Sequence, residues 1–91
     1  MVVVRGVNIY PTAVESVVRS IPEIGEYRVL VSRRGSMAEL ELDIESTDDT
    51  AALRLERALD QAFTLRVPVR RLAAGSLPRF EMKARRWVTN T

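Results

Sequence analysis

One stretch decides the fold, Met37-Ala38-Glu39-Leu40-Glu41-Leu42-Asp43-Ile44-Glu45, in which apolar and acidic residues alternate. An alternation with a period of two predicts a β-strand, because successive side chains point to opposite faces of a sheet. We expect Leu40, Leu42 and Ile44 to face a core. The acids Glu39, Glu41, Asp43 and Glu45 are then expected to form a solvated face and not a metal site.

A second alternating segment precedes this strand. Its apolar positions are Tyr27, Val29 and Val31, and the turn-like sequence Arg34-Gly35-Ser36 separates it from the first stretch. Two alternating runs joined by a short glycine-containing turn predict a β-hairpin.

Two helical patterns flank the hairpin. After Pro11, which suits the first turn of a helix, valines and an isoleucine follow with the spacing of one helical face: Val14, Val17, Val18 and Ile21. Pro22 and Gly25 are expected to end this helix. The second pattern, after the polar residues 46–50, consists of Ala52, Leu55, Leu59, Ala62 and Phe63.

The outer strands complete the predicted fold. The β-branched run Val2–Val4 predicts a strand buried on both faces. Leu65, Val67 and Val69 predict a last strand, which Pro68 places at a sheet edge. The resulting order β-α-β-β-α-β predicts one α+β domain with a ferredoxin-like fold, in which two helices pack on one face of a mostly antiparallel sheet and the first strand is internal. A basic tail is expected after Leu72.

Composition excludes several classes of function. The chain has no cysteine and no histidine, which excludes disulfides, thiolate metal sites, cysteine nucleophiles and the Ser–His–Asp triad. No apolar run approaches the roughly 18 residues of a membrane span, and no signal peptide is recognisable at Met1–Val4. A cytoplasmic protein is therefore the default expectation.

The charges are unevenly placed, although the net charge is only +2. Residues 38–60 carry eight acids against two arginines, and residues 66–86 carry six arginines and one lysine against one acid. Such a basic region favours contact with an anionic ligand or an acidic partner.

Lys83 is the one lysine among thirteen arginines. A lysine in the basic segment 79–87 could bring a compact positive charge to a phosphate or a carboxylate in a transition state. Two other interpretations of this segment remain open: a solvated basic tail, and a nucleic-acid contact in which Phe80 and Trp87 stack on bases.

Two segments together resemble a known family. Val3-Val4-Arg5-Gly6-Val7-Asn8-Ile9-Tyr10-Pro11, with Glu15, resembles the segment that follows the hinge in phenylacetate–CoA ligases. Leu77-Pro78-Arg79-Phe80-Glu81-Met82-Lys83-Ala84-Arg85-Arg86 resembles their final motif. The resemblance covers essentially the whole chain. It implies that residues 1–91 are the mobile C-terminal lid domain of an adenylate-forming acyl-CoA ligase.

The resemblance also implies roles for particular residues. Lys83 would be catalytic and assist attack of a carboxylate on the α-phosphate of ATP, with Arg79 as a binding residue beside it. The segment Arg5, Gly6, Val7 and Asn8 would meet the pantetheine of CoA in the thioester step. ATP with Mg²⁺ and CoA would serve the complete ligase, while the isolated chain is expected to bind no cofactor and no metal.

The same resemblance implies a partner, the large N-terminal ATP-binding domain, joined in cis or acting in trans. The chain itself is expected to be a monomer or a weak homodimer. Phe80 and Met82 stand where the family has a serine and a glycine, which adds bulk beside the lysine. A non-catalytic regulatory or interaction module on the same fold is the alternative, and a nucleic-acid-binding domain is less favoured.

Overall fold

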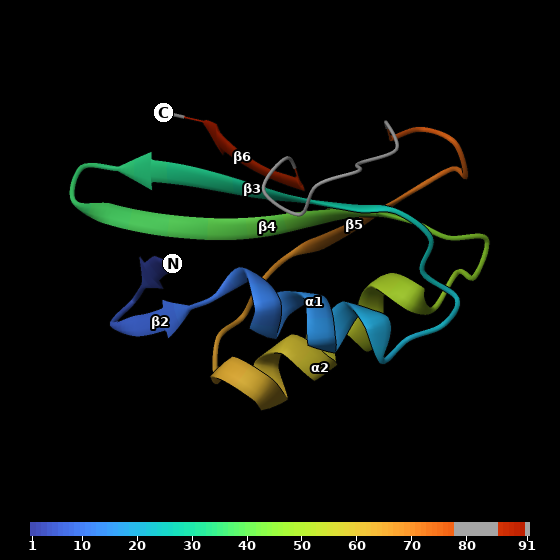
Figure 1. Cartoon of the computed structure of the whole chain (residues 1–91), viewed down its shortest axis with the longest axis horizontal. Helices are drawn as coiled ribbons and strands as arrows, with labels where there is room; N and C mark the ends of the chain where they lie inside the picture. Colours follow the sequence, from blue (N-terminus) through green and yellow to red (C-terminus); the bar gives the residue numbers. More distant parts are fainter. Residues whose placement is uncertain (78–85, 91) are drawn as a thin grey trace.

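A four-stranded sheet forms one layer of the structure, and two helices form the other (Figure 1). The computed structural model describes residues 1–77 and 86–90. The elements in chain order are β1 (Val2–Val4), β2 (Val7–Ile9), α1 (Pro11–Arg19), β3 (Tyr27–Arg34), β4 (Met37–Glu45), α2 (Ala51–Phe63), β5 (Val69–Leu72) and β6 (Trp87–Asn90).

The predicted hairpin is the centre of the sheet. Strands β3 and β4 pair antiparallel from Tyr27↔Ile44 to Arg34↔Met37. The sheet order is β5-β4-β3-β6, with β5 parallel to β4 and β6 parallel to β3. The sheet is therefore mixed: its central pair of strands is antiparallel and its two outer pairs are parallel.

Both helices cover the same face of the sheet (Figure 1). Helix α1 begins at Pro11 and buries Val14 and Val18, whereas α2 buries Ala51, Leu55 and Leu59. Burying one such aliphatic side chain contributes about 1.5–3 kcal/mol, so these two stripes hold the layers together. The α+β class and the placement of the helices are confirmed. Among the described helices, none is long and apolar enough to cross a membrane.

The first strand is not an internal strand of the main sheet, and this prediction is wrong. Val2–Val4 pairs instead with β2 in a separate two-stranded hairpin. Val3 is 49% exposed, and only Val4 of the run is buried. The physical reason is the tight turn at Arg5 and Gly6, which returns the chain on itself so that the valines pair locally. The succession helix, strand, strand, helix, strand is retained from α1 to β5.

The C-terminal part of the sheet also differs from the prediction. Strand β5 begins at Val69, after Pro68, while Leu65 and Val67 are buried in an irregular segment before it. Strand β6 follows the basic segment, where only a tail was predicted. Its Trp87 is partly buried and packs against the core.

Candidate functional site

Arg5 and Gly6 form the tight turn of the N-terminal hairpin. Val4 pairs with Val7, so the loop has two residues, and both have positive φ, 50° at Arg5 and 81° at Gly6. This is the pattern of a type I′ turn, which favours asparagine and glycine. An arginine in the left-handed region costs about 1–2 kcal/mol, and such strain is concentrated at functional sites.

The surface of this turn is open. A Cβ atom added at Gly6 would meet no atom within 4 Å, so the glycine is not required by packing within the chain. Arg5, Gly6 and Asn8 are exposed, whereas Val7 is half-buried. The turn can therefore be approached closely by another molecule or domain.

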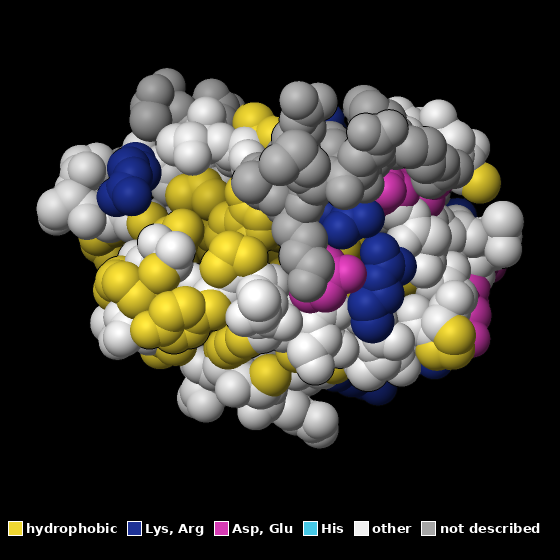
Figure 2. Space-filling view, in the orientation of Figure 1, with side chains coloured by type: hydrophobic (Ala, Val, Ile, Leu, Met, Phe, Trp, Pro, Cys, Tyr) yellow, Lys and Arg dark blue, Asp and Glu magenta, His cyan; other side chains and the backbone are white. Residues whose placement is uncertain are grey.

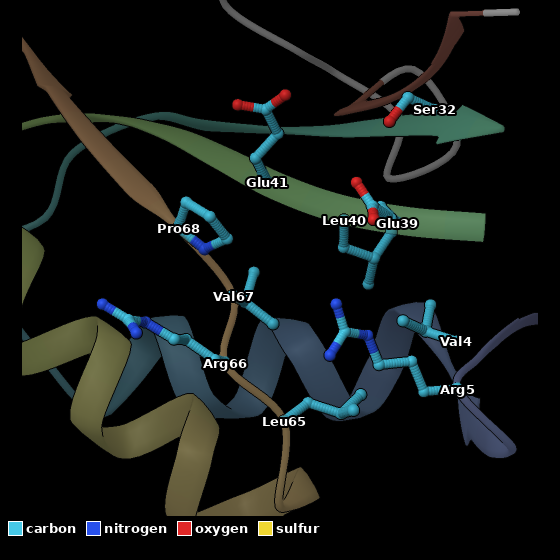
Figure 3. A pocket seen from close by; sticks show the side chains of 10 residues that line it. All are labelled: Val4, Arg5, Ser32, Glu39, Leu40, Glu41, Leu65, Arg66, Val67 and Pro68. Atoms are coloured by element: carbon cyan, nitrogen blue, oxygen red, sulfur yellow. The ribbon is translucent and has the colours of Figure 1, made fainter. Parts of the chain in front are cut away.

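A pocket of about 460 Å³ lies between this hairpin, β4 and the segment before β5 (Figure 3). Its apolar lining consists of Val4, Leu40, Leu65, Val67 and Pro68, and its polar lining of Arg5, Ser32, Glu39, Glu41 and Arg66. Figure 3 shows the Arg5 side chain reaching toward Leu40, whereas the Arg66 side chain points away from Arg5. Neither arginine forms an ion pair with another residue in the described ranges 1–77 and 86–90.

The outer face of β4 is not the solvated acidic row that was predicted. Glu41 is exposed, but Asp43 is only 2% exposed. Its carboxylate accepts hydrogen bonds from Arg28 on β3 at 2.7 Å and from Arg70 on β5 at 3.0 Å. Burial raises the pKa of Asp43, but the hydrogen bonds and charges of Arg70 and Arg28 outweigh it, so the pKa lies below its ordinary value.

Glu45 is also buried, against the prediction, with 2% of its surface exposed. Its two carboxylate oxygens accept one backbone hydrogen bond each, from Gly75 at 3.0 Å and from Leu77 at 2.7 Å. The carboxylate thus holds the loop that follows β5. Within the described ranges, no group of three or more acids is placed to hold a metal ion.

Arg86 forms the centre of a third charged cluster. Its Nε donates to Glu26 at 2.7 Å and its Nη1 to Glu15 at 3.4 Å, and its guanidinium lies 5.0 Å from the centre of the Tyr27 ring. The Tyr27 hydroxyl donates to Glu15. Arg19 binds the other oxygen of Glu15 at 3.1 Å and approaches the same ring at 5.7 Å.

The cluster shifts the ionisation of its members. Burial raises the pKa of Glu15. Hydrogen bonds from Tyr27 and Arg19 and the charges of Arg19 and Arg86 lower it by more, so the pKa lies below its ordinary value. Burial, together with the neighbouring Glu15 carboxylate, raises the pKa of Tyr27. Tyr27 is therefore a neutral hydrogen-bond donor, and Glu15 is ionised.

Exposed apolar side chains lie on and beside the N-terminal hairpin, namely Met1, Val3 and Tyr10. Figure 2 shows hydrophobic side chains gathered on the left of the view, where Figure 1 places this hairpin, and acidic and basic side chains next to one another further right. Contiguous apolar surface of this kind is typical of an interaction site.

The structure thus places four of the six predicted site residues. Arg5, Gly6, Val7 and Asn8 lie together on the hairpin, while Arg79 and Lys83, with Phe80 and Met82, lie outside the described residues. The structure also brings the two sequence segments into contact, because Glu15 of the first binds Arg86 of the second. Sequence reasoning missed the roles of Glu26 and Glu45, since the alternation of a strand does not show what covers its polar face.

The fold and this surface define a C-terminal domain of an AMP-binding enzyme. The model of the AMP-binding enzyme C-terminal domain family matches residues 6–90, and the chain belongs to that family. Over 49 residues, or 53% of its length, the chain is 45% identical to a phenylacetate-coenzyme A ligase of Thermus thermophilus, of which the match covers 11%.

Solved structures agree with this assignment. A 2-hydroxyisobutyryl-CoA ligase in the postadenylation state matches 99% of this chain with a TM-score of 0.85 and 26% identity, over 21% of its own length. A domain of a phenylacetate-coenzyme A ligase from Bacteroides vulgatus matches 98% of this chain over 91% of its own length, with a TM-score of 0.79. At 24% identity, that second match shows the fold alone. The chain therefore spans 11% of the Thermus thermophilus ligase and 21% of the 2-hydroxyisobutyryl-CoA ligase.

Proposed function

We propose that residues 1–91 are the mobile lid of an adenylate-forming acyl-CoA ligase of the phenylacetate–CoA ligase type. One observation carries the proposal: Glu15 of the first family-like segment forms an ion pair with Arg86 of the second. Both segments lie in a domain of the AMP-binding enzyme C-terminal family. The 2-hydroxyisobutyryl-CoA ligase supports it, since its structure with an acyl adenylate and its structure with CoA in the thioesterification state both match this chain.

In this proposal the first half-reaction uses Lys83. Its ammonium group would lie near the α-phosphate of ATP while a carboxylate attacks it, and Arg79 would assist in binding. A positive charge aimed at developing negative charge contributes more in the transition state than in the ground state. In this proposal the large domain holds the complex of ATP with Mg²⁺.

The second half-reaction uses the Arg5–Asn8 turn. The open surface at Gly6 allows the pantetheine arm of CoA to pass close to the backbone. The neighbouring pocket offers an apolar floor for that arm, and Arg5 offers a guanidinium without an ion-pair partner in the described chain for an anionic group. The exposed apolar side chains beside the hairpin would face the large domain.

The test uses a complete ligase in which this domain is joined to the large domain of its Thermus thermophilus relative. Lys83→Ala should slow pyrophosphate exchange with phenylacetate about 10²–10³-fold, and should leave the reaction of pre-made phenylacetyl adenylate with CoA nearly unchanged. Arg57→Ala, which removes an exposed cation on α2, is the matched control and should change neither rate.

Two results would contradict the proposal. One is a loss of less than about fivefold in exchange for Lys83→Ala, which corresponds to only about 1 kcal/mol of transition-state stabilisation. The other is robust exchange by the 91-residue chain alone, since a lid without a large domain has no ATP site.

A further inference from the structure

The two ends of the segment that contains Lys83 meet at one place in the fold. Leu77 donates its backbone N–H to Glu45 at 2.7 Å, and Arg86 donates Nε to Glu26 at 2.7 Å. Glu26 and Glu45 are themselves neighbours, because the N–H of Glu45 donates to the carbonyl of Glu26 at 2.9 Å. The residues that flank 78–85 are therefore held by adjacent carboxylates at one end of the sheet.

Arg86 is held by several buried contacts at once. Its side chain is only 12% exposed, and the side chains of its partners Glu26 and Glu15 are 8% and 17% exposed. Ion pairs with so little water around them are shielded less than surface pairs, and the hydrogen bonds are charge-assisted. The Tyr27 ring adds a cation–π contact on the face of the guanidinium.

Arg86 is connected to Lys83 in a way that Arg19 is not. Arg86 follows the lysine by three residues in the chain. Arg19 also binds Glu15 and also lies over the Tyr27 ring, but it belongs to the last turn of α1 and its side chain is 45% exposed. The two arginines thus share partners and differ in their link to the lysine.

We propose that Arg86 is a positioning residue for Lys83 in adenylation, with Glu26, Glu15 and Tyr27 as its fixed receptor. This inference rests on the function proposed above. A lysine side chain is long and flexible, so its charge reaches one point only if the backbone beside it is fixed. A misplacement of about 1 Å in a catalytic group can cost about 10²-fold in rate.

The first experiment compares the two arginines in the complete ligase described above. Arg86→Met should slow pyrophosphate exchange with phenylacetate about 10–100-fold and change thioester formation from the pre-made adenylate by less than about twofold. Arg19→Met should change both rates by less than about threefold. Equal loss in the two half-reactions, or equal loss in the two variants, would overturn the inference.

The second experiment is a double-mutant cycle with Lys83. If Arg86 acts through the lysine, Arg86→Met should slow exchange no further in a protein that already carries Lys83→Ala. If Arg86→Met instead slows exchange in the Lys83→Ala protein by the same factor as in the parent, Arg86 acts independently of Lys83. The positioning role then fails. If Lys83→Ala alone has no effect, the proposed function and the inference both fail.

A folding defect is separated by two further variants. Glu26→Gln weakens the same contact from the receptor side and should reproduce the selective loss in exchange. Arg86→Lys keeps the charge but not the planar fork of the guanidinium, and it should recover part of the rate lost in Arg86→Met. Thermal unfolding of each variant is measured beside its rates. If the exchange rates of the variants fall in proportion to their unfolding midpoints, whether or not the Arg86–Glu26 contact is kept, the role of Arg86 is merely structural.

Discussion

Substitution of Glu45 by glutamine tests the hold on the loop after β5. Glutamine has nearly the same shape but keeps only one acceptor oxygen, and its amide group faces a backbone N–H that it cannot accept from. Two bonds to Glu45 come from the described part of the chain, from Gly75 at 3.0 Å and from Leu77 at 2.7 Å; one of them is therefore lost and the other loses its charge assistance.

The magnitude follows from the burial of the site. A hydrogen bond to a charged group contributes about 1.5–3 kcal/mol, and an orphaned buried donor costs about 1–3 kcal/mol. Leu77 and Glu45 are 4% and 2% exposed, so water cannot replace the lost partner. We expect a loss of about 2 kcal/mol in the free energy of unfolding, or about 8–16 °C in the unfolding midpoint for a domain of this size.

The assay is urea and heat unfolding followed by circular dichroism, with hydrogen exchange of the Leu77 amide measured in parallel. Glu41→Gln is the matched control, because Glu41 lies on the same face of β4 but is exposed, and it should stay within about 0.5 kcal/mol of the parent. If Glu45→Gln behaves like Glu41→Gln and the Leu77 amide keeps its protection, the reasoning is refuted.

Two other predictions concern the thioester role proposed for the Gly6 turn and the stability of the domain in acid. Gly6→Trp in the complete ligase should slow thioester formation far more than adenylation. The control is Gly35→Trp, at a second exposed glycine with positive φ and open surroundings, which imposes similar backbone strain and should spare both half-reactions. Equal effects of the two variants on thioester formation would remove the thioester role. Asp43 and Glu15 have pKa values below the ordinary 3.8 and 4.5, so their contribution to stability is present above those values and is lost as the pH falls below about 4. The unfolding midpoint should decline there, and less steeply in Asp43→Asn; a decline that is unchanged in this variant would exclude Asp43 as its cause.

The elements that the sequence predicted well are those in which periodicity and burial agree. The β4 stretch, its partner β3 and the stripes of α1 and α2 each have one apolar face, and that face meets the core. Val2–Val4 failed because a continuous apolar run carries no information on its partner. The choice between a distant strand and a local one was made by the Arg5-Gly6 turn, whose glycine was noted but whose two-residue geometry was not inferred.

The candidate site was predicted from motifs and only partly from physical pattern. The motif made Arg5–Asn8 a candidate, and the structure adds the strained turn and the pocket beside it. Glu45 and Asp43 looked like solvated acids because alternation indicates which face a side chain lies on, but not what covers that face. Their partners come from β3, β5 and the loop before residue 78, and such contacts between distant segments leave no periodic signal in the sequence.

The places of β5 and β6 have a consequence for how far Lys83 can reach. These strands occupy opposite edges of the sheet, three strand spacings or about 14 Å apart. The connection between them, residues 73–86, has a contour length of about 45 Å when fully extended. The peptide is thus about three times longer than the crossing demands, and lengthening it by one or two residues changes the free energy of loop closure by only about 0.1 kcal/mol. An insertion between Leu77 and Lys83 should therefore slow the adenylation proposed for Lys83 much more than it changes the stability of the fold.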